Sequence, residues 1–368
     1  MQSIGQKMKR LPLQAGSIGW LVGASACFWV AITLPLIAAA PKEAAAGANK
    51  RFIFYPPRPA PPRIQYLFSC GNNEDWGVRP STFTQFLVGK EPPKTFLKPY
   101  GVAIRDNQIF VADTGARNIT ILDLNKKSMR YFAPSGEGRL GTPINISVDA
   151  DGTRYIADTG RGQVLIFGKD ESFLGAIGNK EETRPTDVKI FKDALYVVDV
   201  KKRCIRVYDK ASHNLTRTFP DQAKAEITQL ISPTNLALDT QGRCYVADLM
   251  GKVLCFGADG QYLRAIGNIG DSPGEFVRPK GMAVDREDRL YVVDAASQVV
   301  QVFDSAGRLL MYFGDAILNL PAGIAIDYEH NNHFQKYVAP DFKLEFLILV
   351  ISQVGEEKLS VFGFGHKL

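Results

Sequence analysis

The feature that most constrains this chain is a repeat of 42 to 48 residues, each copy of which begins at a proline. In the clearest copy, residues 278–304 (RPKGMAVDREDRLYVVDAASQVVQVFD), an apolar run after the proline is followed by a polar turn and by a second run that ends on Asp294. Short β-branched and aromatic runs separated by Gly, Pro and Asp predict strands joined by tight turns. The prolines that open the six copies are Pro99, Pro143, Pro185, Pro233, Pro279 and Pro321.

A period of roughly 40 to 50 residues with four strands per unit is typical of a β-propeller. One such unit cannot bury both of its faces by itself, so the units must stack around a common axis. We therefore predict an all-β, six-bladed β-propeller over residues 63–368. The last unit has only three strands, whereas residues 63–68 (RIQYLF) resemble a fourth strand that no inner strands precede. The N-terminal strand is thus expected to complete the sixth blade and to remove exposed sheet edges.

The runs GVAI, YVAD and VQVFD, at residues 101–104, 245–248 and 300–304, recur in related form in the other copies. This pattern resembles the NHL-repeat family of six-bladed propellers over about residues 63–365. The resemblance implies a platform that binds partners, and some members of that family bind RNA on a positively charged face. The block YVAPDFKLEFLILVISQVGEEKLSVFGFG and the start PPRIQYL are also similar to a subgroup of exported bacterial NHL proteins from cytochrome-rich organisms. That similarity implies an accessory role near extracellular electron-transfer or secretion machinery.

The first 40 residues have the pattern of a membrane-targeting segment. Basic residues 7–10 (KMKR) precede an uncharged stretch that is densely apolar over residues 18–40, long enough to span a bilayer with its basic flank in the cytoplasm. We predict an uncleaved signal anchor, with the propeller on the periplasmic side of the inner membrane. The alternatives are a signal peptide cleaved near residues 38–40 (AAA), which would release a secreted protein, and a lipid anchor on Cys27.

Residues 41–62 are rich in Ala and Pro and are predicted to be an extended linker between the anchor and the propeller. The formal net charge of the chain is +6, and residues 1–62 contain seven basic residues and one acidic residue. The propeller itself is therefore formally neutral. Its net charge gives no indication of nucleic-acid binding.

The five cysteines do not have the spacing of a disulfide framework, and we expect free, mostly buried thiols. The simplest hairpin pairs Asp248 with Lys252, which places Cys244 and Cys255 on opposite faces of one sheet. The sequence contains no C-x-x-C-H motif, so no covalently attached haem is expected.

The connections between second and third strands carry basic residues, and those between first and second strands are acidic. These two sets of loops lie at opposite ends of a propeller, so one basic and one acidic face are expected. The predicted partner-binding residues are Arg117, Arg161, Lys201, Lys202, Arg203 and Lys252. Because export and the absence of interleaved aromatics argue against nucleic acid, the expected partner is a protein of the cell envelope. In the alternative interpretation, the Asp at the end of each second strand neutralises these cations in surface ion pairs.

An enzymatic function is the second hypothesis, because six-bladed relatives include lactonases and metal-dependent lyases. Two residues after their prolines, three successive units carry Asn145, Asp187 and Asn235, an oxygen-rich arc suited to Ca²⁺ or another divalent cation. Tight turns also select Asn, Asp and Gly at such positions. None of the four histidines falls on the face of this arc, and no positioned general base is evident. We therefore favour a non-enzymatic scaffold or accessory subunit without a cofactor over a hydrolytic or lyase-like enzyme.

The sixth unit has an insertion, residues 328–342 (YEHNNHFQKYVAPDF), where the other units have a tight turn. Its aromatic side chains are suited either to covering the seam of the closing blade or to forming a partner-binding patch. We expect the first of these roles.

Overall fold

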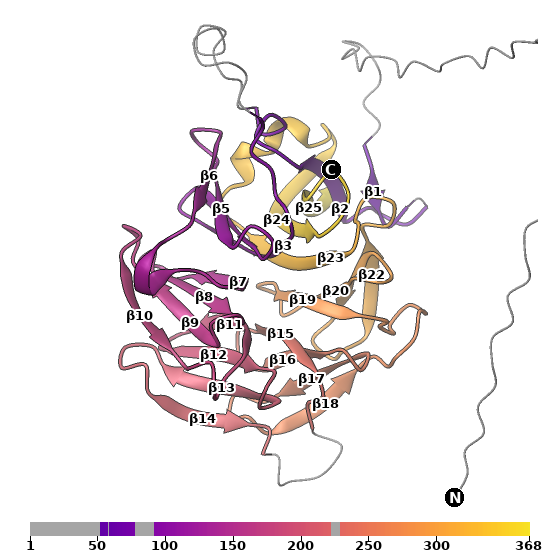
Figure 1. Cartoon of the computed structure of the whole chain (residues 1–368). Helices are drawn as coiled ribbons and strands as arrows, with labels where there is room; N and C mark the ends of the chain where they lie inside the picture. The colour runs from indigo at the N-terminus through magenta and orange to yellow at the C-terminus, as the bar shows by residue number, and fades with distance from the viewer. Residues whose placement is uncertain (1–51, 58, 78–91, 222–228) are drawn as a thin grey trace, which may run out of the picture. The chain divides into compact units, whose positions relative to one another are not determined.

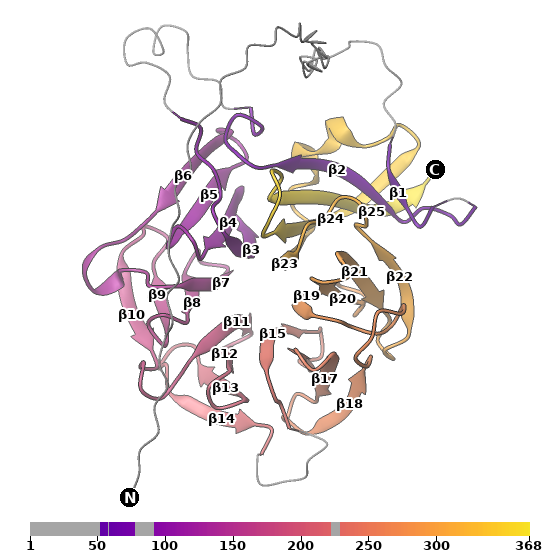
Figure 2. The same ribbon diagram turned by 45° about the vertical axis from the view of Figure 1, so that its right-hand side comes forward.

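The computed structural model describes residues 52–57, 59–77, 92–221 and 229–368, which form six antiparallel sheets around one axis (Figures 1 and 2). The six-bladed all-β propeller is thus confirmed. Every innermost strand begins on one of the six prolines. Blade 1 contains β3 (Pro99–Arg105), β4 (Gln108–Asp113), β5 (Asn118–Asp123) and β6 (Ser128–Phe132), and blade 2 contains β7 (Pro143–Val148), β8 (Arg154–Asp158), β9 (Gln163–Phe167) and β10 (Phe173–Ile177).

The next three blades repeat this order from the axis outward. Blade 3 contains β11 (Pro185–Phe191), β12 (Ala194–Asp199), β13 (Cys204–Asp209) and β14 (Leu215–Phe219). Blade 4 contains β15 (Pro233–Leu238), β16 (Cys244–Asp248), β17 (Lys252–Phe256) and β18 (Tyr262–Ile266). Blade 5 contains β19 (Pro279–Val284), β20 (Leu290–Asp294), β21 (Val299–Phe303) and β22 (Leu309–Phe313).

The sixth blade is completed from both ends of the described chain, as predicted. Its inner strands β23 (Pro321–Asp327), β24 (Phe342–Ser352) and β25 (Leu359–Lys367) are followed outward by β2 (Ile64–Cys70), which pairs with β25 in antiparallel register. Figure 2 shows β2 lying along the outer side of this blade. A short outer strand, β1 (Phe54–Tyr55), adds a fifth strand that the sequence analysis did not identify, because two residues among prolines carry no strand pattern.

The insertion covers the seam between blades 6 and 1, as expected. It forms two short 3₁₀ helices, η3 (Asn331–His333) and η4 (Gln335–Tyr337), and two of its aromatic side chains, Phe334 and Phe342, are buried. Gln65 of the closing strand donates to the carbonyl oxygen of Tyr337 at 2.8 Å and accepts from the N–H of Ala339 at 3.0 Å. These bonds join the N-terminal strand to the insertion.

The apolar core lies between neighbouring blades, where the two faces of each sheet meet those beside it. Asp248 pairs with Lys252 in the predicted register, so Cys244 and Cys255 belong to different core clusters. The four cysteines in the described part of the chain are free and buried, which confirms that prediction for them.

Within the described residues there is no helix long and apolar enough to cross a membrane. The predicted anchor or signal segment, residues 1–40, and most of the predicted linker lie outside them.

Candidate functional site

We call the two ends of the ring the proline face and the turn face. The inner strands begin at the proline face, which also holds the loops between second and third strands. The turn face holds the turns between first and second strands and those between third and fourth strands. Five aspartates organise the proline face. The side chain of Asp113 accepts hydrogen bonds from four backbone N–H groups, two in the incoming connection and two in the adjacent loop, at 2.7 to 3.0 Å.

Equivalent aspartates bind the backbone in blades 2 to 5, and all five are buried: Asp113, Asp158, Asp199, Asp248 and Asp294. The expectation that they form surface ion pairs with the loop cations is therefore wrong, because buried carboxylates are satisfied here by backbone donors. Asp199 does form an ion pair, at 2.8 Å, but with Arg206 of β13.

Five of the six predicted partner-binding cations are exposed on the proline face: Arg117, Lys201, Lys202, Arg203 and Lys252. The sixth, Arg161, is half-buried and donates from Nη1 to the carbonyl oxygens of Glu137 and Arg139 at 2.7 and 2.8 Å. The Lys201 ammonium donates to the carbonyl oxygen of Glu181. Arg161 therefore supports the loop, and the exposed cations are spread over blades 1, 3 and 4.

Exposed apolar side chains lie on the same face as these cations, and these apolar residues were not predicted from the sequence. Six large apolar residues in the loops of the proline face are more than 40 % exposed: Leu97, Ile231, Met250, Ile269, Val277 and Val354. Among the described residues, the turns of the opposite face carry none, and the one such side chain beyond a strand end there is Leu368, which follows β25. Loop positions have no hydrophobic period, so only the structure shows that these side chains share one end of the ring.

The turn face is not uniformly acidic, contrary to expectation. Several of its carboxylates are paired with cations from neighbouring turns or from the same turn. Lys169 of blade 2 lies 2.6 Å from Asp106 of blade 1, and Lys210 of blade 3 lies 2.7 Å from Asp149 of blade 2. Arg289 lies 2.6 Å from Asp285 within a single turn.

The predicted metal-binding arc lies buried at the start of the inner strands of blades 2, 3 and 4. Asp187 accepts from the N–H groups of Val188 and Leu236 at 2.8 and 3.0 Å, and Asn235 Nδ2 lies 3.4 Å from its Oδ2 atom. Lys189 Nζ is 3.7 Å from its other oxygen. Burial raises the pKa of Asp187.

These donors fit a carboxylate held by hydrogen bonds. They do not fit a Ca²⁺ centre, which takes six to eight oxygen ligands. The amide of Asn235 presents its N–H₂ group to Asp187, while no hydrogen bond joins the side chain of Asn145 to that of either residue among the described contacts. In the described part of the chain no three His, Cys, Asp or Glu side chains are grouped as metal ligands.

Tyr100 closes the central channel at the proline face. Its hydroxyl oxygen lies 3.5 Å from Asn235 Oδ1, and its ring lies 5.2 Å from the Nζ atom of Lys280. Lys280 is only 4 % exposed and donates to Gln353 Oε1 at 2.8 Å. Burial, together with two nearby cations, lowers the pKa of Lys280 to about 8.

Gly101 permits the close approach of blades 1 and 2 beside this tyrosine, because a Cβ atom there would lie 2.1 Å from Asn145 Oδ1. The signal for Tyr100 in the sequence is weak. The equivalent positions after the other five prolines hold unrelated residues: Ile144, Thr186, Thr234, Lys280 and Ala322.

The channel remains open at the turn face as a cavity of about 280 Å³. Its wall consists of the inner strands, with aliphatic side chains from every blade and with Lys189 as its one charged residue. The two mouths of the channel therefore differ: Tyr100 closes the one at the proline face, whereas the one at the turn face is open and has mostly aliphatic side chains around it.

Comparisons with known proteins agree with this architecture. Residues 228–346 match a family described as 6-bladed beta-propeller. The chain is 25 % identical to mouse (Mus musculus) NHL repeat-containing protein 3 over 203 residues, which are 50 % of this chain and 56 % of that protein. The match thus spans about half the length of this curated relative.

Solved structures share the fold at low sequence identity. A protein of unknown function from Bacteroides thetaiotaomicron has a TM-score of 0.56 at 13 % identity, covering 82 % of this chain and 75 % of its own. Regucalcin, a calcium-binding protein from Agrobacterium tumefaciens, has a TM-score of 0.53 at 12 % identity, covering 74 % and 92 %. A streptogramin B lyase has a TM-score of 0.51 at 11 % identity, covering 74 % and 84 %. These likenesses show the fold alone.

Proposed function

Because the chain is a six-bladed β-propeller of the NHL type, we propose that it is a platform that binds a protein partner through its proline face. The observation that carries this proposal is the joint presence of exposed apolar side chains and exposed cations on that face. Interfaces take most of their binding energy from a few large side chains, while surrounding charges select the partner. The partner would therefore present apolar anchors beside acidic groups.

The densest part of this surface lies on blades 4 and 5. Met250 and Ile269 are 47 % and 67 % exposed, and their loops adjoin, since a Cβ atom on Gly251 would lie 2.5 Å from Ile269 Cα. Two exposed cations, Lys252 and Arg278, stand at the ends of the same two connections in the sequence. The closed channel mouth favours a flat partner surface over a substrate that enters the ring.

We further propose that residues 1–40 hold the propeller on the periplasmic side of the inner membrane, with secretion after cleavage as the alternative. The platform would then serve as a scaffold or accessory subunit of an envelope complex. A metal-dependent lactonase- or lyase-like activity is not advanced as a second function, because the donors around Asp187 favour hydrogen bonding over metal coordination.

The test is affinity capture of the full-length protein from mildly cross-linked native membranes, with captured proteins quantified by mass spectrometry. The double variant Met250→Asp/Ile269→Asp should lower the yield of a stoichiometric envelope protein at least about tenfold, as expected for the loss of interface anchors. Leu263→Asp on β18 is the matched control, because Leu263 is 48 % exposed on the outer rim. Failure to capture any stoichiometric partner would overturn the platform, and equal capture by both variants would overturn the proline face as its docking surface.

A further inference from the structure

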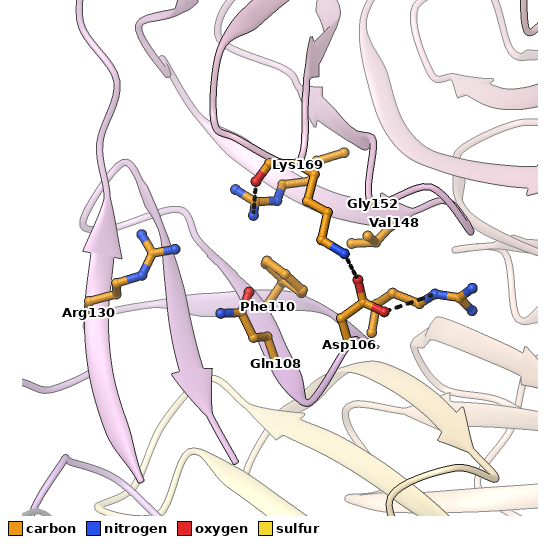
Figure 3. A pocket seen from close by; sticks show the side chains of 9 residues that line it. Asp106, Gln108, Phe110, Arg130, Val148, Gly152 and Lys169 are labelled. Atoms are coloured by element: carbon orange, nitrogen blue, oxygen red, sulfur yellow. Dashed lines mark hydrogen bonds and ion pairs between the residues drawn. The ribbon is translucent and has the colours of Figure 1, made fainter. Parts of the chain in front are cut away.

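A pocket of about 310 Å³ lies between blades 1 and 2 at the turn face, away from the proposed docking surface (Figure 3). Blade 1 contributes the end of β3, the turn after it and side chains of β4 and β6. Blade 2 contributes β7, β8, the turn between them and the turn between β9 and β10, which carries Lys169. The charged residues that line the pocket are Arg105, Asp106, Arg130, Arg154 and Lys169. Figure 3 shows Arg130 and Lys169 on opposite sides of the Phe110 ring.

Arg154 is out of place for the interior of a propeller. It stands four residues before the buried aspartate of its blade and is itself only 4 % exposed. The equivalent residues of blades 1, 3, 4 and 5 are uncharged and fully or almost fully buried: Ile109, Leu195, Cys244 and Leu290. Burying a guanidinium costs free energy unless its charge is paired and all its N–H groups are bonded. A structural role alone does not require arginine at this position.

The protein satisfies Arg154 only in part. Nη1 lies 3.1 Å from Glu171 Oε1, Nη2 donates to the carbonyl oxygen of Lys169 at 3.3 Å, and the guanidinium stacks 4.9 Å from the Phe110 ring centroid. The buried Nε atom has no hydrogen-bond partner. Arginine binds oxyanions through paired N–H groups, and the unpaired Nε–H leaves Arg154 with a donor that the protein itself does not use.

The charges around the pocket do not balance. Four cations face two carboxylates: Asp106 is 2.6 Å from Lys169, and Glu171 is bound by both Arg130 and Arg154. Hydrogen bonding to Lys169 lowers the pKa of Asp106. Burial alone would raise the pKa of Glu171, but hydrogen bonds from Arg130 and Arg154 hold it below its usual value. Both carboxylates stay ionised at neutral pH. The four cations and two carboxylates together therefore have a formal charge of +2.

Gly152 makes room for the side chain of Lys169, one of the four cations. It has a φ of +89°, and a Cβ atom there would lie 2.8 Å from Cδ of Lys169. The glycine therefore lets the Lys169 chain lie across the turn and extend toward Asp106.

We propose that this interblade pocket binds the phosphate group of a small organic phosphate. Cations that approach from two blades suit a tetrahedral dianion better than a planar carboxylate, and the formal charge of +2 matches that of a phosphate monoester. The volume exceeds what a phosphate group alone needs, and the Phe110 ring provides an apolar surface for the rest of the ligand.

The probes are inorganic phosphate and glycerol 2-phosphate, titrated into the purified full-length protein by calorimetry at neutral pH, with sodium chloride of equal ionic strength as the reference. Both probes should bind one site per chain, glycerol 2-phosphate more tightly. Arg154→Met should raise the Kd at least about tenfold, because a charge-assisted hydrogen bond to a buried ligand is lost. Arg130→Gln and Lys169→Gln, whose side chains are 44 % and 67 % exposed, should also weaken binding and keep the test valid if Arg154→Met does not fold.

The matched control is Arg264→Gln. Arg264 holds the position in β18 that Arg130 holds in β6, but it donates to the carbonyl oxygen of Ser305 and does not line the pocket. The control should bind both probes like the unaltered protein. Absence of saturable binding to the unaltered protein overturns the proposal, as does an equal loss in Arg264→Gln and Arg130→Gln, which would show a nonspecific effect of net charge.

Discussion

The hydroxyl oxygen of Tyr100 in blade 1 lies 3.5 Å from Oδ1 of Asn235 in blade 4, although 135 residues separate them in sequence. The strands that carry them, β3 and β15, lie on opposite sides of the ring (Figure 2). One side chain therefore spans the channel at the proline face. This closure separates the exposed surface of that face from the cavity at the other end, whose side chains are mostly aliphatic.

The ring of Tyr100, rather than its hydroxyl group, should contribute most of its stabilisation. Tyr100→Ala is expected to lower the free energy of unfolding by about 2–3 kcal/mol, because it removes a large aromatic ring that is partly buried. Tyr100→Phe should cost less than about 1 kcal/mol, because the bond to Asn235 is long. Urea denaturation of both variants measures the difference. Equal losses would show that the polar contact governs closure.

Ring closure depends on Gln65, which bonds to two backbone groups of the insertion. Gln65→Ala should lower the free energy of unfolding by about 1–3 kcal/mol, because it leaves the N–H of Ala339 and the carbonyl of Tyr337 unpaired. Deleting residues 52–70 should destabilise all six blades in one transition, as calorimetry would show. A truncated protein that melts at the temperature of the full chain would contradict closure by β2. Gln261→Ala, at an exposed turn, is the control for the point variant.

The buried aspartates should contribute more stability than exposed aspartates of similar geometry. The carboxylate of Asp113 accepts hydrogen bonds from four backbone N–H groups, one on Oδ2 and three on Oδ1. Asp113→Asn leaves only one acceptor oxygen, so the N–H groups bound to the other oxygen lose their partner. We expect a loss of about 1–3 kcal/mol in chemical denaturation. Asp259→Asn, at an exposed turn, should change stability by less than about 0.5 kcal/mol. Similar losses in the two variants would mean that burial of the carboxylate is immaterial.

Asp187→Asn tests the metal arc and the pH dependence together. Burial raises the pKa of Asp187 in the folded protein above its value in the unfolded chain. The stability that Asp187 contributes is therefore fully present below the unfolded-state pKa and is lost as the pH rises through the folded-state pKa. The variant should therefore gain stability relative to the unaltered protein between pH 4 and neutral pH, about the range above the unfolded pKa. Calcium should leave the Tm of both proteins unchanged. A calcium-dependent rise in Tm that disappears in the variant would instead support a cation at Asn145, Asp187 and Asn235.

Lys280 should make stability depend on pH in the alkaline range. Its folded-state pKa is lowered to about 8 from 10.5, so its contribution is present above 10.5 and is lost as pH falls through about 8. Lys280→Met removes this group, and the stability difference between the two proteins should shift in favour of the unaltered chain as pH rises from 8 to 10. Urea titrations at matched pH values measure that difference. A difference that stays constant with pH would show that Lys280 is not desolvated in the folded protein.

The blades could be predicted because their determinants are local. A proline followed by an apolar run marks the start of each inner strand, and Asp248 and Lys252 fall in register because a tight turn joins their strands. The missing strand of blade 6 and the unpaired strand near the N-terminus were both visible as exceptions to the repeat. β1 could not be predicted, because a strand of two residues is too short to show a hydrophobic alternation.

The candidate sites depended on tertiary structure. The sequence determined the six blades, their closure and the end of the ring to which each loop belongs, because these follow from strand order. Only the packing of different blades decided that Tyr100 reaches Asn235, that Asp187 faces hydrogen-bond donors and that Arg154 adjoins a pocket. Those contacts depend on the distance between blades and on the volumes of side chains that lie far apart in the chain. A local sequence pattern determines neither of these quantities.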